Sequence, residues 1–253
     1  MQHGPFLEAA LTAATAAETV IRRFYRRQLD VRLKEDTSPV TEADVGAERA
    51  IRDVLGSRFP DHGFYGEETG RHRVDSPYLW LVDPIDGTKS FVRGYPFFST
   101  QIALLHGGRI IVGVSSAAVF GERAWAEEGG GAWLDGQRIR VSDVDRLEDA
   151  TLSTGNLRTL ARGPGWEGLG RLVSRVNRIR GYGDFYHYHL LAAGRIDAVL
   201  ESDVNILDIA ALTLIVEEAG GRFTDLDGGP VGLETTSVLA TNGPLHEPIR
   251  AEL

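Results

Sequence analysis

The feature that most constrains the fold is a series of strand-like segments in the first half of the chain, separated by turn signals. Residues 78–82, 99–120 and 123–141 are rich in apolar side chains, and Gly-Gly and Asp-Gly pairs interrupt them. Such pairs favour tight hairpin turns, because glycine adopts the positive φ angles that those turns require. We therefore predict an antiparallel meander through this part of the chain.

Helical patterns precede and follow these strands. Leucine, isoleucine and phenylalanine recur at helical spacing between Leu7 and Phe24, and a second helix with an acidic first turn is predicted to open at Thr41. Beyond the meander the sequence turns polar at residues 142–150 and 162–168, and helical and strand segments then alternate. We therefore expect two lobes, residues 1–143 and residues 144–253, that meet near Val144.

Composition excludes several classes of function. The 253 residues include no cysteine, so disulfides, thiolate metal sites and cysteine nucleophiles are excluded, and a reducing cytoplasm is the expected location. No signal peptide and no membrane-spanning apolar run are expected. The net charge of -9 argues against nucleic acid as a partner and favours a small molecule. A small anionic substrate would then need a local positive charge.

One basic cluster, Ile21–Lys34, carries arginines at positions 22, 23, 26 and 27. Their spacing favours the solvated face of the amphipathic first helix, since long charged side chains are usually exposed. A phosphate-binding patch is the alternative interpretation of this cluster.

The stretch WLVDPIDGTKSF, residues 80–91, places two carboxylates where an apolar strand ends. Pro84 makes the backbone rigid, so Asp83 and Asp86 are held close together, and they stay ionised only with a cation between them. Hard oxygen ligands on a short turn suit magnesium, and the Ile85 carbonyl is a candidate third ligand. Gly87 and Thr88 then open a helix whose free N–H groups favour a phosphate.

The alternative interpretation of this stretch is an ordinary Pro-Asp-Gly turn with a local aspartate cap. Two further acidic segments favour a site. Glu67 and Glu68 follow Gly66 at the end of another predicted strand, and Asp208 stands at the start of a strongly apolar helix, as either its N-cap or a metal ligand. Because three acidic segments that are separate in the sequence all lie at the ends of predicted elements, we expect them to converge on one site.

The motifs PVTEAD, GEE, WLVDPIDGT and LDIAA followed by EAGG occur in this order along nearly the whole chain. In order and separation they resemble those of the inositol monophosphatase superfamily, which comprises magnesium-dependent phosphatases. The resemblance implies an α/β (α+β layered) fold, an alternating αβαβα sandwich with the active site between two lobes. It also implies a homodimer.

The resemblance further assigns roles to individual residues. It implies a metal site formed by five ligands, namely Glu67, Asp83, the Ile85 carbonyl, Asp86 and Asp208. Thr88 and Asp44 would orient and deprotonate the attacking water, with Glu67 also among the catalytic residues. Gly87 and Thr88 would bind the phosphate through their N–H groups, and Glu68 would orient other groups. From the residues alone, Asp44 is expected only as a first-turn acid of its helix.

Substrate choice is predicted from residues 181–202. Asp184 follows Gly183, and together with Glu201 it supplies acids that suit a cationic leaving group, so this segment resembles the histidinol-phosphate phosphatase branch of the superfamily. That branch implies a role in histidine biosynthesis. Asp208 is also expected to contact the substrate. For Asp184 the alternative is a turn or helix cap.

Other functions remain open at this point. They are an inositol monophosphatase, a broader sugar-phosphate or nucleotide 3′-phosphatase, and a binding protein of the same fold without turnover. Leu207 departs from the family, which commonly has an aromatic residue before the aspartate. The tyrosines and histidines at positions 186–189 are expected to be half-buried packing residues rather than metal ligands.

Overall fold

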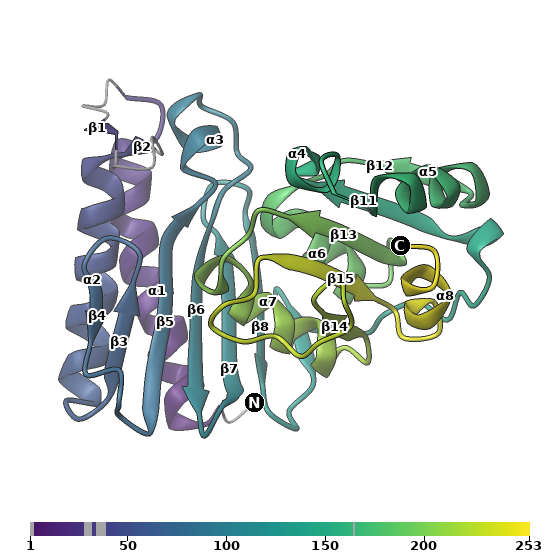
Figure 1. Cartoon of the computed structure of the whole chain (residues 1–253). Coiled ribbons are helices and arrows are strands. Elements are labelled where there is room, and N and C mark those ends of the chain that lie inside the picture. The colour runs from purple at the N-terminus through teal and green to yellow at the C-terminus, as the bar shows by residue number, and fades with distance from the viewer. Residues whose placement is uncertain (1–2, 28–31, 34–38, 164) are drawn as a thin grey trace.

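The computed structural model describes residues 3–27, 32–33, 39–163 and 165–253. Helices and sheets alternate in layers across the molecule (Figure 1). Part of the predicted basic cluster, residues 28–31 and 34, lies outside the described residues. The arginines at positions 22, 23, 26 and 27 are all exposed, which agrees with a solvated surface.

The first layer consists of α1 (Pro5–Phe24) and α2 (Glu42–Arg58), which pack side by side (Figure 1). The buried face of α1 is mostly alanine, so its backbone can approach α2 and the sheet closely. Thr41 caps α2 as predicted, because its hydroxyl accepts a hydrogen bond from Ala43 N at 3.1 Å.

The second layer is an eight-stranded sheet in the order β10-β9-β8-β7-β6-β5-β3-β4. The strands are β3 (Gly63–Gly66), β4 (Gly70–His72), β5 (Tyr78–Asp86), β6 (Ser99–His106), β7 (Arg109–Ala117), β8 (Glu122–Glu127), β9 (Ala132–Leu134) and β10 (Gln137–Ile139). Strands β5 to β10 form the predicted antiparallel meander, whereas β3 pairs with β5 in parallel.

The third layer, α6 (Asp184–Ala192) and α7 (Ile206–Glu218), lies between the two large sheets. Because both faces of α7 are covered, residues Ile209–Val216 are all buried. Gly113 of β7 permits the close approach, since a Cβ atom there would lie 2.5 Å from the Ala211 carbonyl oxygen.

The fourth layer is a five-stranded sheet in the order β12-β11-β13-β15-β14. Its strands are β11 (Thr151–Gly155), β12 (Arg178–Arg180), β13 (Ala198–Ser202), β14 (Arg222–Thr224) and β15 (Ser237–Thr241). The side chains of β13 alternate between faces: Val199 joins the core around α6 and α7, while Ala198 and Leu200 join a separate core on the other face.

That outer core is covered by the fifth layer, α4 (Leu157–Leu160), α5 (Gly165–Arg175) and α8 (His246–Arg250). The remaining elements are short: β1 (Arg32–Leu33) paired with β2 (Pro39–Val40), α3 (Thr88–Val92) and a 3-10 turn at Leu147–Asp149. The αβαβα sandwich is therefore confirmed. The predicted lobe boundary at residues 143 and 144 falls between β10 and β11.

Among the described residues, no helix combines the length and apolarity needed to cross a membrane.

Candidate active site

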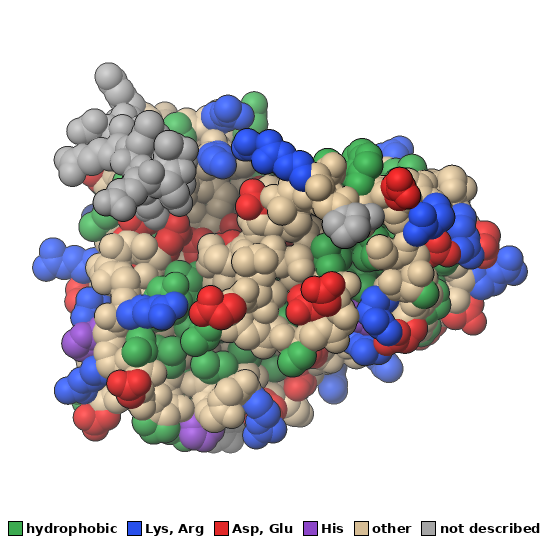
Figure 2. Space-filling model, viewed as in Figure 1, with side chains coloured by type: hydrophobic (Ala, Val, Ile, Leu, Met, Phe, Trp, Pro, Cys, Tyr) green, Lys and Arg blue, Asp and Glu red, His purple; other side chains and the backbone are tan. Residues whose placement is uncertain are grey.

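A cavity of about 190 Å³ brings together the acidic segments that the sequence places far apart. It is lined by Glu67, Asp83, Ile85, Asp86, Gly87, Thr88, Lys89, Ser90, Asn156, Asp184 and Asp208. These residues come from the ends of β3 and β5, from α3, and from the starts of α4, α6 and α7. Figure 2 shows acidic side chains gathered in a hollow in the upper half of the view.

A bulge in β5 turns two of the carboxylates toward this cavity. Asp83 pairs with Gln101 of β6 and Asp86 pairs with Ser99, so Pro84 and Ile85 face only one residue of β6. The extra residue breaks the alternation of side chains, which would otherwise send Asp83 and Asp86 to opposite faces. The strand thus continues through Asp86, whereas the sequence predicted that it ends at Asp83.

Carboxylate oxygens of Asp83, Asp86 and Asp208 all lie within 4.8 Å of one another. Burial raises the pKa of Asp83 and of Asp86 well above the ordinary value, and repulsion from the neighbouring carboxylates raises the pKa further. Burial also raises the pKa of Asp208, to about 7. A bound cation would offset this repulsion, and the hard anionic oxygens fit a divalent metal ion.

Asp208 occupies the third position of α7, and Asn205 is the N-cap. The two residues form a capping box, because Asp208 Oδ2 accepts a hydrogen bond from Asn205 N at 2.8 Å and Asn205 Oδ1 accepts one from Leu207 N. The alternative of an N-cap role for Asp208 is therefore wrong. Leu207 is buried and packs in the central core.

Asp44 and Thr88 meet although they lie on different helices. Asp44 is the third residue of α2, and its Oδ2 accepts hydrogen bonds from the backbone and the hydroxyl of Thr41 at 2.7 and 2.6 Å. Its other oxygen, Oδ1, accepts a hydrogen bond from Thr88 Oγ1 at 3.2 Å. Asp44 thus lies in the first turn of α2, as expected from the residues, forms a capping box with Thr41 that was not predicted, and makes the contact with Thr88 expected from the family.

Gly87 is the N-cap of α3 and has a φ of 89°. A Cβ atom there would lie 2.8 Å from the Phe97 carbonyl oxygen, so both the backbone angle and the space favour glycine. The Ile85 carbonyl accepts a hydrogen bond from Thr88 Oγ1 at 3.0 Å.

The turn after β3 positions Glu67, whose backbone N–H donates to the Val82 carbonyl at 3.2 Å. Glu67 lines the cavity but is not in the group within 4.8 Å. The backbone N–H groups of Glu68 and Thr69 donate to the two oxygens of Glu48 at 2.7 and 2.8 Å. Glu48 is fully buried one turn after Asp44, so it holds this turn in place.

Asp184 lines the cavity from the start of α6 and has a φ of 44°. Burial, followed by repulsion from Glu201, raises the pKa of Asp184 to about 6. Glu201 does not line the cavity: it is buried and accepts hydrogen bonds from His187 Nε2 at 3.1 Å and Tyr188 Oη at 2.7 Å. Of the residues at positions 186–189, Tyr186 is half-buried as predicted, whereas His187, Tyr188 and His189 are fully buried.

Sequence reasoning missed three residues that shape the site, namely Glu48, Lys89 and Asn156. For Glu48 a signal existed, since it lies four positions after Asp44 and so on the same helical face. Asn156 follows β11, and its side chain reaches Glu201 Oε1 at 3.5 Å; no local pattern marks it. Lys89 lies inside the DGTKSF segment, where its positive charge among acidic residues is a signal in the sequence.

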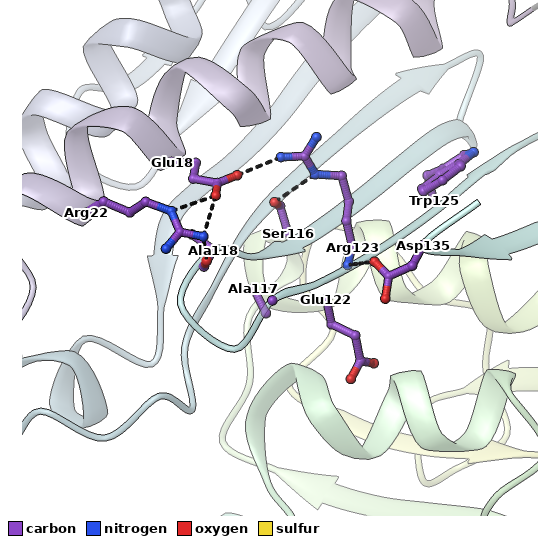
Figure 3. A pocket seen from close by; sticks show the side chains of 10 residues that line it. Glu18, Arg22, Ser116, Ala117, Ala118, Glu122, Arg123, Trp125 and Asp135 are labelled. Atoms are coloured by element: carbon purple, nitrogen blue, oxygen red, sulfur yellow. Dashed lines mark hydrogen bonds and ion pairs between the residues drawn. The ribbon is translucent and has the colours of Figure 1, made fainter. Parts of the chain in front are cut away.

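A larger cavity of about 400 Å³ lies between α1 and strands β7 and β8 (Figure 3). Its two arginines, Arg22 and Arg123, both pair with Glu18 at 2.7 and 2.9 Å. Because these positive charges are already paired, this cavity is not the candidate site.

Comparison with known proteins gives consistent matches. The model of the inositol monophosphatase family matches residues 3–253. The histidinol-phosphatase of Mycobacterium tuberculosis is 42% identical over 260 residues, covering 100% of this chain and 99% of that protein. The inositol-1-monophosphatase of Rhizobium meliloti is 37% identical over 243 residues, covering 93% and 90%.

Among solved structures, the extragenic suppressor protein suhB of Bartonella henselae superposes with a TM-score of 0.91. It is 34% identical, and the match covers 98% of each chain.

Proposed function

The chain belongs to the inositol monophosphatase family, and on this premise we propose that it is a magnesium-dependent phosphatase that hydrolyses histidinol phosphate to histidinol and phosphate. The observation that carries the proposal is the cluster of Asp83, Asp86 and Asp208. These residues share one cavity with Thr88, whose hydroxyl contacts Asp44 behind it. The expected metabolic role is in histidine biosynthesis.

The proposed metal ligands are Glu67, Asp83, the Ile85 carbonyl, Asp86 and Asp208, all of which line the cavity. When bound, magnesium would activate water and offset the negative charge of the phosphoryl group and the leaving oxygen. Oxygen ligands of this kind support magnesium rather than zinc. Asp208 is also proposed to contact the substrate.

The proposed catalytic pair, Thr88 and Asp44, accepts a proton from the attacking water. Thr88 has a single hydroxyl proton, which it can donate to Asp44 Oδ1 or to the Ile85 carbonyl. When it donates to Asp44, a lone pair of Thr88 Oγ1 can accept a hydrogen bond from the attacking water. As the water gives its proton to Thr88 Oγ1, the proton of the threonine hydroxyl passes to Asp44 Oδ1. Because Asp44 Oδ2 is held by Thr41, the carboxylate keeps Oδ1 directed at Thr88. Glu67 would help to orient the same water.

Substrate selection is proposed to depend on Asp184. A carboxylate that lines the cavity from the start of α6 suits a leaving group that carries an ammonium group and an imidazole. Glu201 would contribute negative charge from behind Asp184, since its effect on the pKa of Asp184 requires the two to be near. Gly87 and Thr88 would bind the phosphate through their backbone N–H groups.

A second candidate is inositol monophosphatase activity, which the 37% identity to the Rhizobium meliloti enzyme favours. A broader sugar-phosphate or nucleotide 3′-phosphatase and a silent binding protein are the remaining alternatives. The test is phosphate release from histidinol phosphate, inositol 1-phosphate, fructose 1,6-bisphosphate and 3′-phosphoadenosine 5′-phosphate, compared as kcat/KM.

We expect the highest kcat/KM with histidinol phosphate, complete loss of turnover on chelation, and recovery with magnesium. A higher kcat/KM with inositol 1-phosphate would identify that compound, and not histidinol phosphate, as the preferred substrate. Turnover in metal-free buffer would contradict the metal-dependent mechanism. If no phosphate were released from any of the four monoesters, the alternative of a binding protein without turnover would be supported.

We also propose a homodimer in the cytoplasm. Val92, the last residue of α3, and Tyr95, three positions later, are large apolar side chains that are both exposed, which supports a protein contact there. The lack of cysteine supports a reducing compartment. Analytical ultracentrifugation that found only monomer at micromolar concentration would argue against the dimer.

A further inference from the structure

Lys89 is unusual both in composition and in position. Of the 27 lysines and arginines only two are lysines, Lys34 and Lys89, and Lys34 lies outside the described residues. Among the described residues that line the candidate site, Lys89 is the one with a positive charge. A chain that otherwise uses arginine thus has a lysine at this position.

The surroundings of Lys89 are strongly acidic. Five carboxylates line the same cavity, those of Glu67, Asp83, Asp86, Asp184 and Asp208. Lys89 follows Thr88 in the first turn of α3, is solvent-exposed, and lies near enough to Asp184 to lower the pKa of that carboxyl against the effect of burial. Its charge therefore acts inside the cavity.

A phosphate monoester that enters this cavity meets a negative field from the carboxylates and from the net charge of -9. The inner oxygens of the phosphoryl group would face the metal ligands. Oxygens that face the cavity mouth need another donor, and an exposed ammonium group can reach them without being desolvated in the free protein. A lysine is a compact charge that can move with the substrate, whereas arginine favours a fixed two-point contact.

We propose that Lys89 is a substrate-binding residue whose ammonium group donates hydrogen bonds to phosphoryl oxygens at the mouth of the site. This inference rests on the proposed phosphatase function and adds to it the local positive charge that an anionic substrate needs. The contact is to the phosphate and not to the leaving group, so it applies to every phosphate monoester that the protein accepts.

The experiment measures binding of inorganic phosphate by calorimetry in saturating magnesium, for the wild-type protein and three variants. Lys89→Gln should weaken phosphate binding by about 10- to 100-fold, the value of a charge-assisted hydrogen bond. Lys89→Arg keeps the charge and should stay within about tenfold of wild type. Arg93→Gln is the matched control, since Arg93 is exposed at the end of the same helix and does not line the cavity.

Magnesium binding without phosphate separates this role from a structural one. Removing a positive charge beside a cation site should leave the magnesium affinity of Lys89→Gln unchanged or slightly increased. If Lys89 were instead a structural partner of Asp184, Lys89→Gln would lower the melting temperature and leave phosphate affinity unchanged. That result would overturn the inference.

Chemical modification gives an independent readout, because few amines compete. In a Lys34→Arg background, acetylation of Lys89 is followed by mass spectrometry with and without inorganic phosphate and magnesium. We expect phosphate to slow the acetylation of Lys89, and equal rates would count against the contact. If the wild-type protein neither binds phosphate nor hydrolyses any monoester, the proposed function fails as well; normal turnover with unprotected Lys89 overturns only the inference.

Discussion

At the scale of single residues, the site depends on carboxylates whose two oxygens have different partners. One oxygen of Asp44 accepts hydrogen bonds from Thr41 at the cap of α2 and the other accepts one from Thr88, so the fold fixes the direction of the proposed catalytic contact. Asp83 and Asp86 are different, because burial and mutual repulsion disfavour their charged forms. Their arrangement is favourable only when a cation is bound.

Thr88→Val removes the hydroxyl at nearly constant volume and is expected to reduce kcat by at least about a hundredfold, the usual contribution of positioned acid–base groups. The melting temperature should change little, since Thr88 is only partly buried. Thr88→Ser keeps the hydroxyl and serves as the control in the same steady-state assay. Wild-type kcat in Thr88→Val would remove Thr88 and Asp44 from the mechanism.

Asp184→Asn tests the contact with a cationic leaving group. Asparagine tolerates the φ of 44° as aspartate does, so the backbone should be preserved. The variant should lower kcat/KM for histidinol phosphate by an amount equivalent to about 1.5 to 3 kcal/mol of binding free energy. The value of kcat/KM for inositol 1-phosphate should hardly change. Equal losses with both substrates would indicate a structural role. Asp203→Asn, at an exposed position with a φ of 64°, is the control.

At the scale of elements, two helix starts and one bulged strand position the site. The capping boxes of α2 and α7 have the same form, with the functional aspartate at the third helical position. The bulge at Pro84 of β5 then turns Asp83 and Asp86 to one side. These three local features bring together residues that lie more than a hundred positions apart in the sequence.

Asp208→Asn separates the capping role of Asp208 from metal binding. Asparagine keeps an oxygen that can accept the hydrogen bond from Asn205 N, and it removes a charge that is repelled by its neighbours. The melting temperature in chelator should therefore be unchanged or higher than that of wild type. The magnesium concentration for half-maximal activity should rise, since one anionic ligand is lost.

Both quantities would be measured on the same preparations of wild type and Asp208→Asn. An unchanged magnesium midpoint with full kcat would exclude Asp208 from the metal site, and a lower melting temperature in chelator would show that the cap requires the carboxylate.

The sequence predicted elements better than their junctions. The meander, the helices that begin near Thr41 and Asp208, and the acidic ends of β3 and β5 follow from local patterns of apolar residues and turns. The bulge at Pro84 and the buried Glu48 depend on pairing with β6 and on the turn after β3, which are contacts between distant segments. Asn156 comes to the cavity only through the layering of the second sheet, so no local pattern could identify it.

At the scale of the whole molecule, some layers supply the residues of the candidate site and others mainly stabilise the fold. The central core around α6 and α7 joins both sheets, and the outer core under α4, α5 and α8 stabilises the second sheet without contributing a residue to the cavity apart from the start of α4. The proposed catalytic role of Asp44 rests on family resemblance, because the residues alone indicate only an acid in the first turn of its helix. The carboxylate cluster, in contrast, is indicated by the neighbouring charges of Asp83 and Asp86 at the end of a strand.

His246 links global stability to pH. Burial, helped by the positive charges of Arg222 and Arg250, lowers the pKa of His246 to about 4, and its ring nitrogens contact Thr224 and Thr241 at 3.1 and 3.2 Å. The unfolded chain takes up this proton near pH 6.5 and the folded protein near pH 4. The contribution of neutral His246 is therefore complete above about pH 6.5 and is lost as the pH falls toward 4.

Urea unfolding of wild type and His246→Asn at intervals from pH 7.5 to pH 4 would measure this effect. The stability advantage of wild type should be largest at pH 7.5 and should shrink steadily on acidification. A constant difference across this range would show that His246 does not remain neutral in the folded protein.

The double duty of the capping aspartates has an evolutionary consequence. A descendant of this protein that lost its activity would still be under selection to fold, and the caps of α2 and α7 would preserve Asp44 and Asp208. Asp83 would be protected in the same way, because its Oδ1 accepts a hydrogen bond from Ile85 N at 2.9 Å within the bulge. Asp86 is different, because without a cation its repulsion from the neighbouring carboxylates opposes folding, and neutral residues at that position would spread. Among divergent copies of this chain, the acid at position 86 therefore distinguishes active from inactive proteins, while the acids at the helix starts do not.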